Sequence, residues 1–319
     1  MYYGLSPIRS LTPRHIVEPR GGAAVRSTDL ASSIRPASER ERAGRAAASG
    51  GEPTLAFAER VPYDAYVRAD TLHTLQRTLS DDPGEMSFLV ISQVMELYFG
   101  LVHHELREVQ RLLRADDVWG ALLPSRRAAL HLDGLNAGWQ CLRWMTPADF
   151  NRFRDLLGEG SGFQSAMYRR LEFVLGLKTA SLIRPFRGQP AVHGELAEAL
   201  RSPSLWDDVV ALLARSGHDI PADLLGRDFS DEHRPHPAVE AAWVEIYGDA
   251  GPGNHLRLLG EALTGISEGF GDWRRHHLAS VRRAMGAKAG TGGSNGVRWL
   301  RRSMDREVFP ELWSARTHI

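Results

Sequence analysis

The residues best suited to chemistry lie near the end of the chain, in HHLASVRRAMGAKAGTGGSNG, from His276 to Gly296. Two adjacent histidines can bind a metal or haem, and the glycines that follow allow backbone to come close to a ligand. Adjacent helical residues point about 100° apart, so only one of His276 and His277 can face a given site. Either histidine, taken alone, could instead simply stabilise the end of the helix.

The glycine-rich segment GTGGSNG does not fit a nucleotide-binding loop. A dinucleotide fingerprint needs a preceding strand and a following helix, and a P-loop needs Gly-Lys-Ser/Thr. Here a long amphipathic helical pattern precedes the glycines. One glycine would suffice to end that helix. The additional glycines favour a segment whose backbone approaches a ligand or a partner helix.

Two further groups of side chains share a face at helical spacing. Phe88 and Ser92 lie on one face of a long predicted helix, and Phe150, Arg154 and Leu157 on one face of another. Arg154 is either a surface arginine with a buried stem or a cation held in a pocket, where its planar fork would pair with a carboxylate. Composition alone favours the surface position.

The elements that must position these residues are helices. Apolar residues at three- and four-residue spacing predict helices over most of the chain after residue 61, and strand-like alternation is scarce. The expected helices span residues 88–113, 117–144, 147–158, 161–175, 195–200, 205–215, 237–247 and 254–287. The fold class is therefore all-α, with one helical domain over residues 59–319. Residues 1–58, rich in Arg, Ser, Ala and Gly, are expected to form a loose arm or to pack on a neighbouring subunit.

Composition narrows the functional class. The 319 residues are 43% hydrophobic and 24% charged, and the net charge is zero, which gives no support for binding nucleic acid or an anionic membrane. The single cysteine, Cys141, cannot form an intrachain disulfide and is expected to be a small buried residue. No apolar run predicts a membrane span, so a cytoplasmic protein is expected.

Several separated stretches, in the same order, resemble the tryptophan 2,3-dioxygenase superfamily over about residues 61–317. The most specific are FLVISQVMELYFGLVHHELR, FNRFRDLLGEGSGFQSAMYRRLEFVLG and WRRHHLASVRRAMGAKAGTGGSNGVRWL. This resemblance implies a helical bundle that binds haem b and uses O₂ to oxygenate the indole of tryptophan or a substituted tryptophan. It also implies a homotetramer whose subunits contribute to one another's sites.

The resemblance assigns roles to individual residues. His277 corresponds to the proximal ligand of the haem iron, with His276 pointing elsewhere, and Gly292 is expected at the cofactor. Arg154 corresponds to the residue that holds the substrate carboxylate, and Thr291 to the one that contacts the amino-acid part. The remaining matches are aromatic or pocket-lining positions. Phe88, Phe150, Leu157 and Ser161 are expected around the indole, and Tyr63 and Tyr66 are expected to reach the site of an adjacent subunit.

Two substrate-facing positions depart from the common family pattern. Ser92 stands where most members have a distal histidine, and Phe150 stands where they have a tyrosine. A serine hydroxyl is no base near neutral pH. These changes favour mono-oxygenation to an oxindole-type product, as in relatives from specialised metabolism. The alternatives are ring cleavage to N-formylkynurenine and, in a different class, a non-catalytic haem-binding protein.

Overall fold

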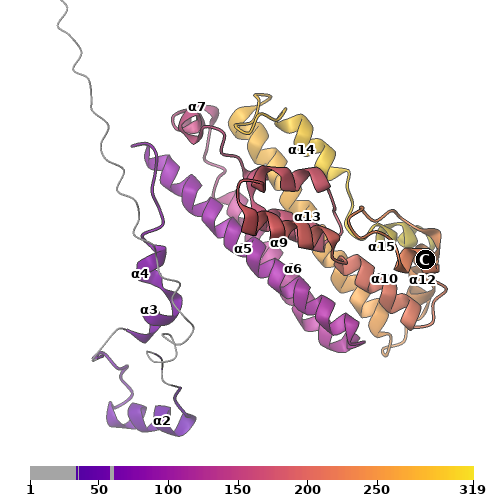
Figure 1. The fold of residues 1–319 in the computed structure, drawn as a ribbon. Helices are drawn as coiled ribbons and strands as arrows, with labels where there is room; N and C mark the ends of the chain where they lie inside the picture. The colour runs from indigo at the N-terminus through magenta and orange to yellow at the C-terminus, as the bar shows by residue number, and fades with distance from the viewer. Residues whose placement is uncertain (1–33, 35, 58–60) are drawn as a thin grey trace, which may run out of the picture. The chain divides into compact units, whose positions relative to one another are not determined.

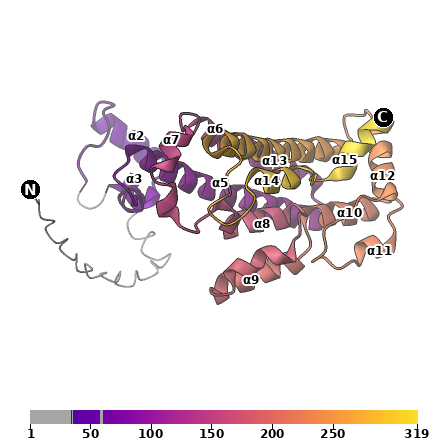
Figure 2. The ribbon, with the colours of Figure 1, turned by 90° about the horizontal axis from the view of Figure 1, so that it is seen from above.

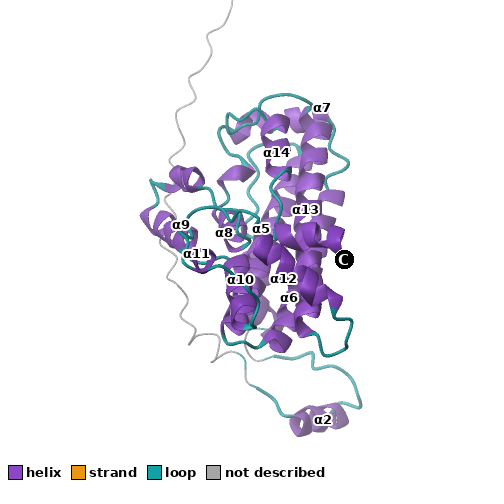
Figure 3. Ribbon diagram, turned by 90° about the vertical axis from the view of Figure 1, so that its right-hand side faces the viewer, coloured by secondary structure: helices purple, strands orange, loops and turns teal. Residues whose placement is uncertain are grey.

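The structure, a computed structural model, describes residue 34 and residues 36–57 and 61–319. Within this part of the chain the regular elements are helices, and no strand is present (Figure 3). The predicted all-α fold class is therefore confirmed. Much of the expected N-terminal arm lies outside the described residues.

The chain divides into two compact units, residues 1–75 and residues 76–319. The first unit contains α2 (Glu39–Ala48), α3 (Pro62–Val67) and α4 (Ala69–Leu72). Ser38 and Glu41 form a reciprocal capping box at the start of α2. A regular helix thus forms inside the segment expected to be a loose arm, and the expected boundary at residue 58 lies inside the first unit.

The second unit holds the long helices and a set of short ones. Its α-helices are α5 (Pro83–Arg114), α6 (Val118–Gln140), α7 (Pro147–Asn151), α8 (Ala166–Val174), α9 (Pro190–Arg201), α10 (Leu205–Arg215), α11 (Ala222–Leu225), α12 (Pro237–Gly248), α13 (His255–Met285), α14 (Val297–Met304) and α15 (Pro310–Ser314). Its 3-10 helices are η1 (Arg154–Leu157), η2 (Gly162–Gln164), η3 (Ala180–Phe186) and η4 (Ala315–His318).

The three longest helices form the frame of the second unit. α5 packs on α6, α6 packs on α13, and α8 and α10 pack on α5 (Figures 1 and 2). α5 begins where Asp82 accepts a hydrogen bond from the amide of Gly84, with Pro83 in the first turn. Its fully buried stripe includes Val102, Leu106 and Val109, as the sequence pattern predicts.

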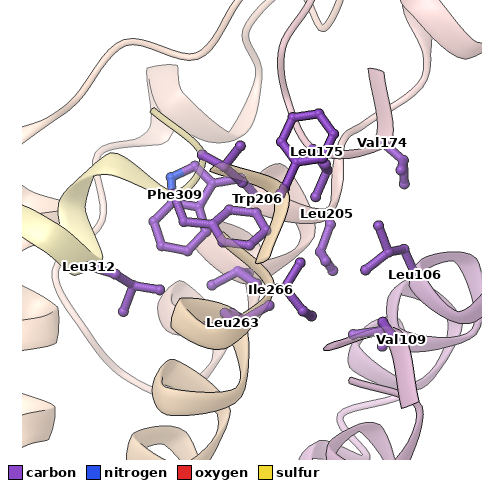
Figure 4. Packing of buried hydrophobic residues seen from close by; sticks show 14 of the residues in the cluster. Leu106, Val109, Val174, Leu175, Leu205, Trp206, Leu263, Ile266, Phe309 and Leu312 are labelled. Atoms are coloured by element: carbon purple, nitrogen blue, oxygen red, sulfur yellow. The ribbon is translucent and has the colours of Figure 1, made fainter. Parts of the chain in front are cut away.

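The main core brings residues from distant parts of the chain together. Trp206 of α10 stacks on Phe309 and on Trp243, with ring centroids 5.1 and 6.1 Å apart. Leu106 and Val109 of α5 and Leu263 and Ile266 of α13 belong to the same cluster (Figure 4). This packing ties the C-terminal end of the second unit to its central helices.

Three local expectations are wrong. The segment 161–175 is not one helix, because η2 ends at Gln164, Ser165 is extended with φ and ψ of −66° and 117°, and α8 begins only at Ala166. The segment 147–158 is not one helix, because α7 ends at Asn151 and the chain resumes as η1 after Phe153, whose φ and ψ are −125° and −9°. Cys141 is exposed rather than buried. It caps the end of α6, and the inward positions that follow are taken by Leu142 and Met145, which are 6% and 5% exposed.

α5 is the one helix, within the residues described, that is long and apolar enough to cross a membrane. α5 contacts α6, α8 and α10, and most of its buried side chains lie from Met95 onward. Some of its apolar side chains remain uncovered, notably Leu97, which is 66% exposed.

Candidate active site

The second unit encloses a cavity of about 630 Å³. Residues of α5, α6, α8, α13 and α14 line it, together with the loop segments 157–163 and 290–296. Most of the lining is apolar, and such a volume falls within the range of ordinary small-molecule and cofactor sites.

His277, on α13, lines this cavity, and two tryptophan rings that also contact each other pack against it. The Trp139 ring stacks on its imidazole at 5.0 Å and 15°, and the Trp273 ring lies 5.2 Å away at 49°. Burial lowers the pKa of His277 to about 4, because no nearby group stabilises the charged form. The imidazole is therefore neutral near pH 7 and keeps a nitrogen lone pair for a metal.

His276 has a different position from its neighbour. It is not among the residues that line the cavity, and its Nδ1 is buried without a hydrogen-bond partner. The 100° step between adjacent helical residues accounts for this difference.

The surroundings of His277 fit a haem group. Within the described residues no three His, Cys, Asp or Glu side chains gather to hold a bare metal ion. A single histidine suits a metal that brings its other ligands with it, as haem iron does. The Nε1 atoms of Trp139 and Trp273 are buried and lack acceptors, so a cofactor that carries carboxylates could satisfy donors at this site.

The expected indole-pocket residues meet at one end of the cavity. Phe88 and Ser92 come from α5, Phe150 from α7, Leu157 from η1, and all of them line the cavity with Ser161. The ring centroids of Phe88 and Phe150 are 5.9 Å apart. The Ser92 hydroxyl donates to the Phe88 carbonyl at 2.8 Å, so only its lone pairs are left for a ligand.

Arg154 and Thr291 join two loops. The Nη2 of Arg154 donates to the carbonyl of Ala289 at 2.6 Å, and the hydroxyl of Thr291 donates to the carbonyl of Gly160 at 2.5 Å. Thr291 lines the cavity, but Arg154 is not among the lining residues, and its buried Nε has no partner. The two residues therefore hold the glycine-rich loop against the segment that follows α7.

Close packing explains one glycine of that loop. A Cβ on Gly292 would lie 2.4 Å from Cε1 of Phe163 and 2.9 Å from Cβ of Ser161. Gly293 and Gly296 instead have φ of 76° and 48°, a region that favours glycine. The loop thus needs glycine for two separate reasons, close approach and backbone conformation.

Tyr63 and Tyr66 belong to the other unit. Both lie on α3, and their side chains are 69% and 76% exposed.

Sequence reasoning missed the residues around the predicted iron ligand. Trp139 and Trp273 flank His277, and a buried cluster of Arg169, Glu172 and Arg274 also lines the cavity. Helical spacing could have identified the two residues on α13, which precede His277 by four and three positions. Nothing in the local sequence indicates that α6 and α8 bring the others to the same place.

Comparison with known proteins identifies similar chains. Residues 49–319 match the family model described as tryptophan 2,3-dioxygenase. A tryptophan 2,3-dioxygenase of Bacillus thuringiensis is 38% identical over 263 residues, which cover 82% of this chain and 94% of that protein. Tryptophan 2,3-dioxygenase 1 of Ralstonia nicotianae is 37% identical over 278 residues, covering 86% and 94% of the two chains. A Burkholderia pseudomallei tryptophan 2,3-dioxygenase is 38% identical over 265 residues, 83% of this chain and 87% of its own.

Proposed function

Because the chain belongs to the tryptophan 2,3-dioxygenase family of O₂-using oxidoreductases, we propose that it oxygenates the indole C2=C3 bond of tryptophan or a substituted tryptophan. The observation that carries the proposal is a neutral histidine, His277, in the wall of a large apolar cavity. We assign His277 as the ligand of haem b and place the reaction in the cytoplasm.

Haem, when bound, supplies the activation of O₂. The chain's own part is to hold the cofactor and to orient the substrate. His277 offers a deprotonated ring nitrogen, and the flanking Trp139 and Trp273 rings restrict its rotation. The apolar lining excludes water from the reacting atoms, which strengthens every polar contact made inside.

The amino-acid end of the substrate is assigned to Thr291, which lines the cavity, and to Arg154, which is not among the lining residues and would have to leave the Ala289 carbonyl to reach a ligand. A guanidinium pairs with a carboxylate through two parallel hydrogen bonds, and a hydroxyl can accept from an ammonium group. Both side chains now bind loop carbonyls, Ala289 and Gly160. A zwitterion that engages either side chain would therefore compete with these loop contacts, and the enzyme would gain rate mainly by positioning the indole.

Ring cleavage to N-formylkynurenine, with both oxygen atoms retained, is the first candidate outcome. It needs no further reductant, and the relatives named above are called dioxygenases. Mono-oxygenation to an oxindole-type product is the second candidate. It releases one oxygen atom as water and consumes two additional electrons and two protons.

The second candidate rests on Ser92 and Phe150. The Ser92 proton is already donated to the Phe88 carbonyl, so Ser92 can accept a hydrogen bond from an indole N–H but offers no free proton. Phe150 is 6% exposed and contributes no hydroxyl to the pocket. Both features change how an oxygenated intermediate would be protonated, which is the point at which the two outcomes diverge.

Product mass spectrometry under ¹⁸O₂ tests the outcome. Reduced, haem-loaded protein is incubated with tryptophan and, separately, with β-methyltryptophan. Two labelled atoms in a ring-opened product support dioxygenation, and one labelled atom in an intact ring supports mono-oxygenation. Absence of turnover with haem bound would instead support the non-catalytic haem protein. Ser92→His should shift the ratio of the two products if Ser92 controls it.

The haem ligand is tested by a matched pair of variants. His277→Ala should abolish the ferrous spectrum of a histidine-ligated haem, whereas His276→Ala should leave it largely intact because its side chain is outside the cavity. The opposite result would show that the assignment is off by one residue.

We further propose a homotetramer in which Tyr63 and Tyr66 enter the site of a neighbouring subunit. Their exposure leaves them free for such a contact. α6 also carries Trp119, Leu123 and Leu130 at spacings of four and seven residues, so they share a face, and all three are more than half exposed. A second subunit would cover this face.

A further inference from the structure

A buried charged cluster lies in the wall of the cavity, outside the residues assigned to catalysis. Arg169 and Glu172 belong to α8 and Arg274 to α13, and their exposed fractions are 1%, 3% and 5%. Arg169 Nη1 donates to one carboxylate oxygen of Glu172. Arg274 Nη2 lies 3.6 Å from the other oxygen.

The positive charges in this cluster outnumber the negative one. Arginine stays protonated in proteins, so two guanidinium groups face one carboxylate. The Nε atoms of Arg169 and Arg274, and Nη2 of Arg274, are buried without hydrogen-bond partners. Arg274 is otherwise compensated by the Arg306 carbonyl, 2.8 Å from Nη1, and by the face of Phe270. Neither of these groups carries a formal charge, so a net charge of +1 remains.

Within the described residues, the protein places no second buried carboxylate along the cavity to neutralise this charge. The remaining carboxylate among the described lining residues is Glu96, which is exposed on α5 and screened by solvent. Aromatic rings fill the space between α8 and α13. Tyr168 and Trp273 have centroids 4.8 Å apart, and Arg169 lies over the Tyr168 ring at 4.7 Å. The charge therefore acts through a medium of low dielectric constant.

The cluster is close to the assigned iron ligand. Arg274 precedes His277 by three residues on α13, and residues at this spacing are neighbours on a helix surface. No ion pair or hydrogen bond joins the His277 ring to a carboxylate within the described part of the chain, and the neighbours packed against the ring are Trp139 and Trp273. His277 thus lacks an anionic partner of the kind that would favour an oxidised iron if haem were held there.

We infer that the Arg169–Glu172–Arg274 cluster stabilises the reduced, ferrous state of the cofactor held by His277. Reduction adds one electron to the iron, and a fixed positive charge nearby favours the state with the lower charge. The cluster is a tuning device and not a catalytic group, since it acts through the field at the iron. This inference rests on the proposed function, which places haem at His277.

Spectroelectrochemical titration of the haem-loaded protein tests the inference. Arg274→Leu removes one positive charge and should lower the reduction potential, so that the ferrous-to-ferric ratio at a fixed applied potential falls on the order of tenfold, or about 59 mV. Glu172→Gln removes the negative charge and should raise the potential by a similar amount. Arg274→Lys keeps the charge and should give a smaller shift than Arg274→Leu.

Arg275→Gln is the matched control. It removes a positive charge one residue along the same helix, but the Arg275 side chain is 56% exposed and is paired with Asp272. Solvent screening should leave the potential nearly unchanged. A shift equal to that of Arg274→Leu would show that burial of the charge is irrelevant and would overturn the inference.

Opposite shifts in Arg274→Leu and Glu172→Gln support the inference, because general damage to the pocket would move both potentials in one direction. Unchanged potentials, or shifts of the same sign, overturn it. If Arg274→Leu fails to fold or to load haem, Glu172→Gln decides alone, and a potential that is not raised refutes the idea. Failure of the unmodified protein to form a histidine-ligated ferrous haem would instead refute the proposed function.

Discussion

Substitution of Gly292 tests how tightly the glycine-rich loop must approach the cavity wall. In Gly292→Ala the new methyl group would lie 2.4 Å from a ring carbon of Phe163 and 2.9 Å from Cβ of Ser161. Gly292 does not have positive φ, so the backbone tolerates alanine and the effect is steric. The ring of Phe163, or the loop itself, must move by about 1 Å to restore van der Waals contact.

Overpacking of this kind costs about 1–3 kcal/mol. Because the strain falls on a loop that lines the cavity assigned to the substrate, most of it should appear as weaker substrate binding, roughly 5- to 150-fold in Kd for tryptophan. Tryptophan titration of the haem-loaded protein, followed by the haem spectrum, measures the Kd. Thermal unfolding should show a much smaller change than binding.

Two further variants make this reasoning refutable. Gly253→Ala places a methyl group where nothing lies within 4 Å, so it should leave tryptophan binding unchanged. The double variant Gly292→Ala, Phe163→Ala removes the main clashing ring and should recover part of the lost affinity, giving a non-additive cycle. Normal affinity in Gly292→Ala, or strict additivity in the double variant, would show that the close contact with Phe163 does not limit the loop.

Three other predictions follow from particular contacts. Arg154→Lys cannot hold the Ala289 carbonyl and also pair bidentately with a carboxylate, so KM for tryptophan should rise about 10- to 100-fold while kcat falls less. Burial acts to raise the pKa of Glu85, but hydrogen bonds from Leu79 and Ser80 outweigh it and lower the pKa below 4.5. The ionised Glu85 therefore stabilises the fold above pH 4.5, and this contribution is lost as the pH falls through the lowered pKa. In urea unfolding, Glu85→Gln should be less stable than the unmodified protein near pH 7, and the two should converge below pH 4. Leu123→Asp should reduce the assembled fraction in size-exclusion chromatography with light scattering, because it charges an exposed apolar position on α6, and an unchanged mass would refute that interface.

The Gly292 and Arg154 predictions share one basis, the contacts between the glycine-rich loop and the residues assigned to the substrate. Arg154 and Thr291 now donate to the carbonyls of Ala289 and Gly160, and they are also the residues assigned to the substrate zwitterion. A ligand that engages either side chain must change the anchoring of the loop. Variants of the loop should consequently alter affinity and loop order together.

The sequence by itself determined the helices and the residue types available for chemistry. α10 spans Leu205–Arg215, the predicted range, because Ser204 and Asp207 form a capping box before a strongly amphipathic run. Helical periodicity also established that His276 and His277 point in different directions. These features depend on neighbours within one or two turns, which sequence spacing records directly.

Capping and periodicity signals mispredicted the structure where contacts with distant segments outweigh the local helix propensity. Thr146 and Pro147 start α7 as predicted, but the helix stops at Asn151, and the residues that follow place Phe153 at 0% exposure beside Phe88 of α5, with ring centroids 5.5 Å apart. Burial of that ring against another helix is worth more than a few further helical hydrogen bonds. Cys141 likewise became exposed because the chain turns at the end of α6.

Only the tertiary structure decided which residues of other helices line the cavity with His277. Trp139 comes from α6, Arg169 and Glu172 from α8, and Arg274 from the same helix as the histidine. Their convergence depends on how α6, α8 and α13 pack, and packing is selected by the burial of whole helix faces rather than by any local pattern. The sequence identified a histidine able to bind a cofactor, whereas the packed helices placed an uncompensated positive charge beside it.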